Sequence, residues 1–365
     1  MSERVFQSAK RACYSGLDSV ALRRELAARL KPAIPFDSYA FGTTDPDTGL
    51  LTHLVAASVP EAMTLAFIDR LYPFESARYA MDSARRGRTV YDTGEESAEI
   101  RAALRANGYA HGSHAVFGAR DRLWGKWCIL QGSASSAELA RTHALLRRLA
   151  PHITHGLRHG SLVEASGLRG GGSSGVRAGS AAGVVVLNAA GRIVLRTESA
   201  VPMLADLRDV GVTFPDAVPL SLISATSRLR YALRSGAPDA PNAVSLRARG
   251  LSGRWYGVEA SLAEPEAHGA DAAVVVLRQF LPREIASMLT DLYGLSRRER
   301  EVVAAVARGL TTKEIAAQLQ VSPHTVKEHL DRACEKTGAR GRKALVARIF
   351  FDAYVPNFGV THEVA

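Results

Sequence analysis

Hydrophobic and polar positions change period several times over the first 160 residues, which predicts a mixture of helices and strands. Apolar residues three and four positions apart indicate helices, and alternating apolar residues indicate strands. Helical spacing covers residues 18–31, 61–72 and 135–160. Residues 36–58 predict two strands around an Asp-Pro-Asp-Thr-Gly turn, and 109–132 predict a hairpin that turns near Arg120 and Asp121.

The last of these helices carries an apolar seam. Its members recur at three and four residues: Leu146, Leu149, Ile153 and Leu157. Such a seam suits either pairing with a second copy of the chain or packing on the chain's own sheet. The pattern alone leaves both open.

Glycine and serine dominate residues 167–183, a composition typical of a flexible linker. Beyond it, residues 181–207 predict a strand, a turn at 188–191, a second strand and a helix. Three strands in meander order follow, up to residue 280. We therefore expect a domain at 1–160, a linker at 161–180 and a second domain at 181–280.

The C-terminal region carries clear helix-start signals. Ser296 and Thr311 are each followed three residues later by glutamate, the pattern of a capping box, and Ser322 precedes a proline. With Gly309 and Gly338 as stop signals, these predict helices at 297–308, 312–319, 323–337 and 342–352.

The third of these helices is strongly two-sided. Val326, Leu330 and Ala333 share one face, while the opposite face and its flanks are polar: His324, Thr325, Lys327, Glu328, Asp331, Arg332 and Glu335. A helix buried all round would not keep that face polar. It is therefore either solvated or in contact with a polar partner.

Composition narrows the function. The chain has 365 residues, a formal net charge of +10 and a pI of about 9.8, which suits a polyanionic partner. Three well-separated cysteines fit a reducing compartment, and no apolar run reaches the ~20 residues of a membrane span. We expect a cytoplasmic α+β multidomain protein with no membrane association.

Motifs for several chemistries are missing from the sequence. It contains no P-loop, no GxSxG and no HExxH. We therefore expect no enzymatic activity, no metal site and no cofactor.

Residues 292–350 carry four motifs in order: LSRREREV, GLTTKEIA, VSPHTVKEHL and KTG. Together they resemble the LuxR-type helix-turn-helix of bacterial transcription regulators. The resemblance implies an all-α four-helix domain at 281–356, followed by a tail at 357–365. It also implies double-stranded DNA, a homodimer and RNA polymerase as partners.

The same resemblance implies which residues contact DNA. Candidates for phosphate contacts are Thr312, Lys313, Thr325, Lys336, Arg340 and Arg342, and Ser322 opens the recognition helix. Candidates for base contacts are His324, Lys327, Glu328, Asp331 and Arg332. Residues 290–356 hold twelve Lys and Arg against eight Asp and Glu, a net charge of +4.

Two positions depart from the family pattern. Asp331 stands where many members have a basic residue, and Gly341 stands where serine is usual. Because Asp331 and Glu328 repel phosphate, we expect weak binding by one copy and dependence on a dimer. Leu345, Val346 and Ile349 of the fourth helix serve either as the family's dimerisation surface or as core.

The order of elements at 15–160 resembles a GAF domain with an α/β sensor fold, and 181–280 resembles a shortened α+β PAS-like domain. With a LuxR-type module, this architecture is common in actinobacterial regulators. A GAF-like fold implies a pocket for a small-molecule effector, for which the strands offer these candidates: Tyr39, Phe41, Tyr109, His111, His114, Phe117, Trp124 and Trp127. The same side chains also suit a core.

Three hypotheses for regulation follow. In the first, the sensor domains bind a small molecule and a helix at 282–294 couples them to the DNA-binding domain. In the second, they are a protein-interaction scaffold without a ligand. In the third, the chain binds DNA without regulation.

Overall fold

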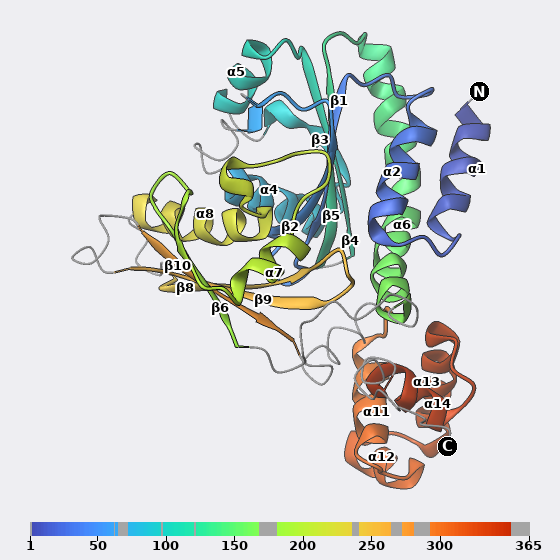
Figure 1. Cartoon of the computed structure of the whole chain (residues 1–365). Coiled ribbons are helices and arrows are strands. Elements are labelled where there is room, and N and C mark those ends of the chain that lie inside the picture. The colour runs from blue at the N-terminus through green and yellow to red at the C-terminus, as the bar shows by residue number, and fades with distance from the viewer. Residues whose placement is uncertain are drawn as a thin grey trace, which may run out of the picture. The chain divides into compact units, whose positions relative to one another are not determined.

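The computed structural model describes residues 2–61, 63–64, 72–95, 98–119, 122–167, 181–235, 241–263, 272–280 and 293–351 (Figure 1). The chain forms two compact units. Residues 1–160 and 179–279 make the first, and residues 161–178 and 280–365 make the second.

The first unit contains an antiparallel five-stranded sheet in the order β2-β1-β5-β4-β3. Its strands are β1 (Ser38–Thr44), β2 (Leu51–Ala57), β3 (Val90–Asp92), β4 (His111–Ala119) and β5 (Arg122–Gln131). The expected strand pair and hairpin are both present, with Phe41 opposite Trp127 and Ala115 opposite Trp127 on the two sides of β5. The predicted turn residues, 120 and 121, lie outside the described residues.

Helices cover both faces of this sheet (Figure 1). On one side lie α1 (Ser2–Cys13), α2 (Ser19–Leu30) and α6 (Ser136–Gly167), and on the other lie α4 (Tyr72–Arg85) and α5 (Ala98–Ala106). The apolar seam of α6 is buried inside the unit, from Leu146 to Leu157, which favours packing on the chain's own sheet. Pro151 lies within the helix, and α6 continues through residues 161–167, where the sequence predicts linker.

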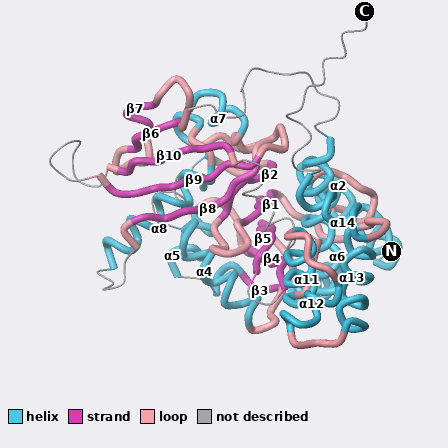
Figure 2. The backbone as a smooth tube through the Cα atoms, turned by 90° about the horizontal axis from the view of Figure 1, so that it is seen from below, coloured by secondary structure: helices cyan, strands magenta, loops and turns pink. Residues whose placement is uncertain are grey.

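A second antiparallel sheet has the order β7-β6-β10-β9-β8, and Figure 2 shows its strands side by side. The strands are β6 (Gly183–Leu187), β7 (Ile193–Arg196), β8 (Ala243–Arg249), β9 (Trp255–Leu262) and β10 (Ala273–Gln279). The predicted helix is α7 (Ala200–Asp206). A longer helix, α8 (Leu220–Ser235), was not predicted from the sequence.

The two sheets share one hydrophobic core. Leu51 and Leu54 of β2 belong to the same buried cluster as Leu222 of α8 and Val258 of β9. The connection after α7 also lies alongside β2. The Ala56 amide donates to the Val210 carbonyl, and the Val210 amide donates to the Leu54 carbonyl, both at 2.9 Å. The outer edge of β2 is therefore covered by the second half of the unit.

Two polar anchors reinforce this junction. The buried Asp45 carboxylate accepts hydrogen bonds from the Arg247 backbone amide at 2.9 Å and from Arg247 Nε at 3.0 Å. The Asp209 carboxylate accepts from the Leu54 amide at 2.6 Å and the Leu220 amide at 2.8 Å. Each carboxylate thus joins backbone that lies far away in the sequence.

A buried basic pair lies behind the same edge. Arg23 of α2 donates to the carbonyl of Phe41 at 2.9 Å and to His53 Nδ1 at 2.9 Å. Burial, together with the charge of Arg23, holds the pKa of His53 well below its usual value. The imidazole is therefore neutral, and its Nδ1 accepts a hydrogen bond from the guanidinium of Arg23.

The second unit is helical. It contains α11 (Arg297–Ala307), α12 (Thr312–Leu319), α13 (Pro323–Thr337) and α14 (Arg342–Val346), followed by the π-helical turn η3 (Ala347–Phe351). The first three helices match the predicted bounds to within one residue. The fourth differs, because its regular α-helix ends at Val346 and the chain continues as a π-helix.

Several predicted segments lie outside the described residues. These are most of the helix at 61–72, residues 168–180 of the linker, nearly all of the coupling helix at 282–294, and the tail at 357–365. Among the helices of the described part of the chain, none has the length and apolar content needed to cross a membrane.

Candidate nucleic-acid interface and a cavity in the first unit

Local hydrogen bonds set the geometry of α12 and α13. Thr311 and Glu314 form a complete capping box at the start of α12. The helix ends at Gln320, whose φ of 55° lies in the left-handed region and reverses the chain. Ser322 then caps α13, its hydroxyl accepting from the amide of Thr325 at 3.0 Å. The result is a helix, a short turn and a second helix, as the sequence predicts.

Apolar contacts fix the orientation of α13. Val326 is fully buried among Val302, Ile315 and their neighbours, and Ala333 is fully buried in a second cluster with Val303 and Leu345. Because these contacts use one face of α13, the other face is left at the surface. Leu345 and Ile349 are buried in the same cluster, so they belong to the core of this unit.

The expected DNA-contacting residues are all at least partly accessible. Nine are exposed: Lys313, Ser322, His324, Lys327, Glu328, Asp331, Arg332, Lys336 and Arg340. Three are partly exposed: Thr312, Thr325 and Arg342. The structure therefore brings basic and hydroxyl side chains from the start of α12 and the length of α13 onto accessible positions.

Acidic side chains are mixed with these groups. His324 Nε2 lies 3.5 Å from Glu328 Oε1, one helical turn away, and forms an ion pair when the imidazole is protonated. Asp331 is exposed one turn further along. This face of α13 therefore carries both acidic and basic side chains. It is not a uniformly basic surface of the kind that binds DNA through charge alone.

Two of the expected phosphate contacts also have partners inside the unit. Lys336 Nζ lies 2.7 Å from Glu299 Oε2, and the Glu299 side chain is only 4% exposed. Arg342 donates to the carbonyl of Leu310. These side chains join the end of α13 to the start of α11, and the start of α14 to the loop before α12. Sequence reasoning did not identify either role.

The Glu299 carboxylate is stabilised in its charged form. Burial favours the neutral acid, but hydrogen bonds from Lys336 and from the amide of Ser296 outweigh it, so the pKa of Glu299 is lowered. A carboxyl with a lowered folded-state pKa stabilises the fold above its unfolded pKa. That contribution is lost as the pH falls through the folded-state pKa.

We expect Glu299→Gln to destabilise the second unit by about 2 kcal/mol at pH 7, because it leaves Lys336 without its charged partner. The difference from wild type should shrink as the pH falls through the lowered pKa of Glu299, where the wild-type carboxylate itself becomes protonated. Hydrogen exchange at the amides of α11 and α13 measures both effects. Glu301→Gln is the control, since its partners Arg297 and Arg298 are exposed and such pairs contribute ~0.5 kcal/mol. Equal effects of the two variants would contradict this role.

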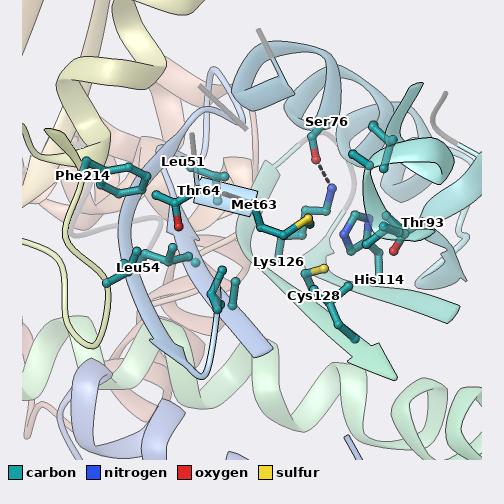
Figure 3. Close-up of a pocket in the computed structure, with 18 residues that line it drawn as sticks. Leu51, Leu54, Met63, Thr64, Ser76, Thr93, His114, Lys126, Cys128 and Phe214 are labelled. Atoms are coloured by element: carbon teal, nitrogen blue, oxygen red, sulfur yellow. Dashed lines mark hydrogen bonds between the residues drawn. The ribbon is translucent and has the colours of Figure 1, made fainter. Parts of the chain in front are cut away.

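An apolar cavity lies in the first unit, between the first sheet, α5 and the connection that follows α7 (Figure 3). It encloses about 120 Å³. Most of its lining is aliphatic or aromatic, including Leu51, Leu54, Leu104, Leu130 and Phe214. The polar lining groups include Ser76, Thr93, His114 and Lys126.

Of the eight side chains expected to line a cavity, only His114 lines this one. Successive residues of a strand point to opposite faces of its sheet. Phe41, Phe117 and Trp127 form a buried aromatic cluster, with Phe41 stacked on Trp127 at 4.8 Å between ring centroids. Tyr39 packs against Trp127, and Trp124 is buried beside Arg158 of α6. Tyr109 is buried with Leu104, and His111 is partly exposed.

Small residues at alternate positions of strand β1 leave the space that forms this cavity. Ala40 and Gly42 of β1 line the cavity, at positions that alternate with Tyr39 and Phe41 of the same strand. A Cβ on Gly42 would lie 2.4 Å from the side chain of Leu51. The signal in the sequence was therefore the small and polar residues that alternate with the aromatic ones.

Comparison with known proteins identifies the second unit. The model of the bacterial regulatory proteins of the luxR family matches residues 294–349. The spore germination protein GerE of Bacillus subtilis is 42% identical over 55 residues, which are 15% of this chain and 74% of GerE. The chain belongs to the LuxR family of bacterial regulatory proteins. Its membership rests on the helices from α11 to η3.

A second relative matches over a stretch of similar length. The probable transcriptional regulatory protein NarL of Mycobacterium tuberculosis is 51% identical over 53 residues, which are 14% of this chain and 24% of NarL. The chain thus matches about a quarter of that relative's length.

Solved structures resemble the LuxR-family chain only distantly. The VqmA–ligand–DNA complex of Vibrio cholerae gives a TM-score of 0.24 at 14% identity, over 48% of this chain and 86% of VqmA. SdiA of Escherichia coli gives 0.28 at 13% identity, over 90% and 91% of the two chains. These scores are too low to support an inference about this chain.

Proposed function

We propose that this LuxR-family protein is a cytoplasmic transcription regulator that binds promoter DNA as a homodimer, with α13 in the major groove. The observation that supports this most is the two-sided character of α13. One face is fixed by Val326 and Ala333, and the other presents a mixed polar surface without a large apolar side chain. A rigidly held helix with an accessible polar face is what groove recognition requires.

The surface divides into two roles. Thr312 and Lys313 lie at the N-terminus of α12, where backbone amides and the helix dipole favour an anion, so we assign them to phosphate. Thr325 and Arg340 complete that set. Because Lys336 and Arg342 have partners within the unit, we expect them to act on DNA mainly by holding the helices in place.

We assign the contacts with base edges to the exposed side chains of α13. Lys327 suits the O6 and N7 acceptors of guanine, and Glu328 or Asp331 suits the N4 donor of cytosine. His324 and Arg332 lie on the same face. Since the acidic side chains oppose phosphate, one copy should bind weakly, and two copies on paired half-sites supply the affinity. RNA polymerase is the partner through which such binding would change transcription.

We assign signal detection to the first unit, with a GAF-like domain at 1–160 and a PAS-like domain at 181–280. The cavity favours a small-molecule effector over a protein-interaction scaffold. Its lining includes Val212 and Phe214 from the connection between the two sheets, so a bound molecule would touch both halves of the unit. The first unit can thereby report occupancy as a change in its own packing.

Lys313→Ala should lower the salt dependence of DNA binding. The slope of log K against log salt changes by ~0.9 for each phosphate that the protein no longer neutralises, once per copy in a dimer. Fluorescence anisotropy of a labelled duplex at several salt concentrations measures that slope. Arg11→Ala, an exposed cation of α1, is the control and should leave it unchanged. A wild-type slope in Lys313→Ala would remove Lys313 from the phosphate contacts.

The function itself is tested with a duplex that the full-length protein enriches from a random library. A mobility shift should show one saturable complex, and its native mass should equal two protein chains and one duplex. A complex containing a single chain at saturation would contradict the homodimer. Failure to shift any enriched duplex would contradict DNA binding.

A further inference from the structure

The cavity of the first unit is lined mainly by aliphatic and aromatic side chains. Leu54 and Phe214 lie at one end of it, and Thr93 and His114 lie at the other (Figure 3). Its described lining residues include no aspartate or glutamate. The lining therefore favours an occupant with an apolar body and no positive charge.

Several polar side chains of the lining are held by the protein itself. Lys126 donates to Ser76 Oγ, and its Nζ lies 5.6 Å from the centroid of the Tyr91 ring. Thr64, at the end of the cavity away from these groups, donates to the carbonyl of Pro60 at 3.3 Å (Figure 3). The side chains of Lys126, Ser76 and Thr64 thus have partners without any ligand.

Thr93 differs from these side chains. The residue is 1% exposed and lines the cavity, and its hydroxyl has no hydrogen-bond partner among the residues that the structure describes. Buried hydroxyls are nearly always hydrogen-bonded in folded proteins. A polar atom of a ligand would satisfy this one.

The position of the Thr93 hydroxyl is set by a glycine. A Cβ on Gly112 of β4 would lie 2.6 Å from Thr93 Oγ1. Gly112 is two residues from His114 on the same strand, so it faces the side of the sheet on which His114 lines the cavity. The hydroxyl of Thr93 therefore lies on the cavity side of the sheet.

The size of the cavity limits the apolar body of an occupant. A protein cavity of about 150 Å³ lined by aliphatic and aromatic side chains accommodates benzene. The 120 Å³ enclosed here is slightly smaller. A single ring or a short branched chain fits, whereas a long acyl chain or a fused-ring cofactor does not.

We propose that this cavity binds a small uncharged organic molecule, with one hydroxyl or carbonyl oxygen on Thr93 and a single ring or short chain that extends toward Leu54 and Phe214. This assignment deepens the sensing role proposed above and rests on it for its regulatory meaning. Burial of the apolar body supplies most of the affinity, and the hydrogen bond to Thr93 fixes the orientation. An ionised group would lose its hydration on entry, and the mainly aliphatic lining does not replace it.

Calorimetry of the full-length protein with phenol, toluene and benzoate tests this assignment. Phenol and toluene have nearly the same shape, but only phenol can form a hydrogen bond with Thr93. Both should bind at millimolar concentration or below, and benzoate should bind more weakly than phenol by ~10-fold or more, because its charge must be desolvated. Benzoate binding as tight as that of phenol, or no binding of phenol at millimolar concentration, would overturn the proposal.

Thr93→Val replaces the hydroxyl by a methyl group of similar size. It should weaken phenol by ~3–10-fold, the loss of one neutral hydrogen bond, and should leave toluene within ~2-fold of the wild type. Repacking of the cavity would change both affinities together, so the ratio of phenol to toluene affinity reports the hydrogen bond alone. An unchanged ratio would overturn the role of Thr93.

Two neighbouring alanines of α5 locate the site. Ala103 lines the cavity, whereas Ala102 is exposed. Ala103→Leu should weaken phenol and toluene by at least ~10-fold, because the larger side chain fills the space. Ala102→Leu is the matched control on the same helix and should bind both probes like the wild type. Wild-type affinities in Ala103→Leu would place the binding elsewhere and overturn the assignment.

The calorimetric result is independent of DNA binding. If phenol binds as expected but does not alter affinity for the enriched duplex, the cavity assignment stands and the sensing role fails. If DNA binding fails altogether, the phenol measurement still decides the cavity. The two proposals can therefore fail separately.

Discussion

Lys327→Ala is expected to weaken binding of the full-length protein to its enriched duplex by at least ~30-fold. Lys327 is exposed beside the buried Val326, so the core of the unit fixes its position on α13. Removing one good base contact costs ~1–3 kcal/mol, and in a homodimer the change affects each half-site. Alanine is a good helix former, so α13 itself should persist. Anisotropy titration at a fixed salt concentration measures the change.

Arg234→Ala is the matched control, since it removes an exposed cation from α8 without touching the second unit. It should bind DNA like the wild type. Lys327→Ala should also reduce discrimination between the enriched duplex and a scrambled one, which a loss of general charge would not do. Wild-type affinity for Lys327→Ala at matched salt would place recognition elsewhere.

The second large effect concerns the junction of the two sheets. Asp45→Ala should destabilise the first unit by about 3–5 kcal/mol, because it leaves Arg247 without its main partner in a poorly solvated position. The Asp45 carboxylate also accepts from the amides of Asp47 and Thr48 at 3.0 and 2.9 Å, so the turn after β1 loses its hydrogen bonds as well. Chemical denaturation of the full-length protein measures the loss.

Asp47→Ala provides the comparison. Asp47 also pairs with Arg247, but its side chain is 47% exposed, so its removal should cost ~1 kcal/mol or less. Hydrogen exchange in Asp45→Ala should rise in both sheets, because they share one core. A stable variant, or exchange that rises in β8 alone, would contradict the shared junction.

The helices of the second unit could be located from the sequence because their signals are local. Ser296, Thr311 and Ser322 each satisfy backbone amides within their own first turn, so a short stretch of sequence specifies each start. The π-helical end after Val346 has no such marker. The sequence also gave no sign of the partners of Lys336 and Arg342. Glu299 and Leu310, respectively, each lie more than thirty residues away along the chain.

The strands of the first unit other than β3 were predicted from the sequence pattern, but the cavity was not. Aromatic residues drew attention to one face of the sheet, where Phe41 and Trp127 fill the core. The cavity lies on the other face, where Ala40 and Gly42 leave space and Lys126 occupies a buried strand position. The inward-facing lysine also marked this face, because a lysine is rarely buried unless it has polar partners.

The junction between the sheets was beyond sequence reasoning. Asp45 and Arg247 are separated by 202 residues, and the pairing of Val210 with β2 involves a connection with no strand pattern of its own. Helix α8 was missed because its buried face carries small polar residues such as Ser221, Ser224 and Thr226, which blur the apolar period. Only the folded chain shows that these residues face a shared core.

Recognition of a specific DNA sequence through α13 is tested most directly by selection from a random duplex library with the full-length wild type and with Lys327→Ala. The wild type should enrich a two-fold-symmetric sequence with two half-sites, as a homodimer requires. Lys327→Ala should lose or alter enrichment at the same position in both half-sites. A wild-type selection with no enriched sequence, or an identical sequence enriched by the variant, would contradict recognition through this helix.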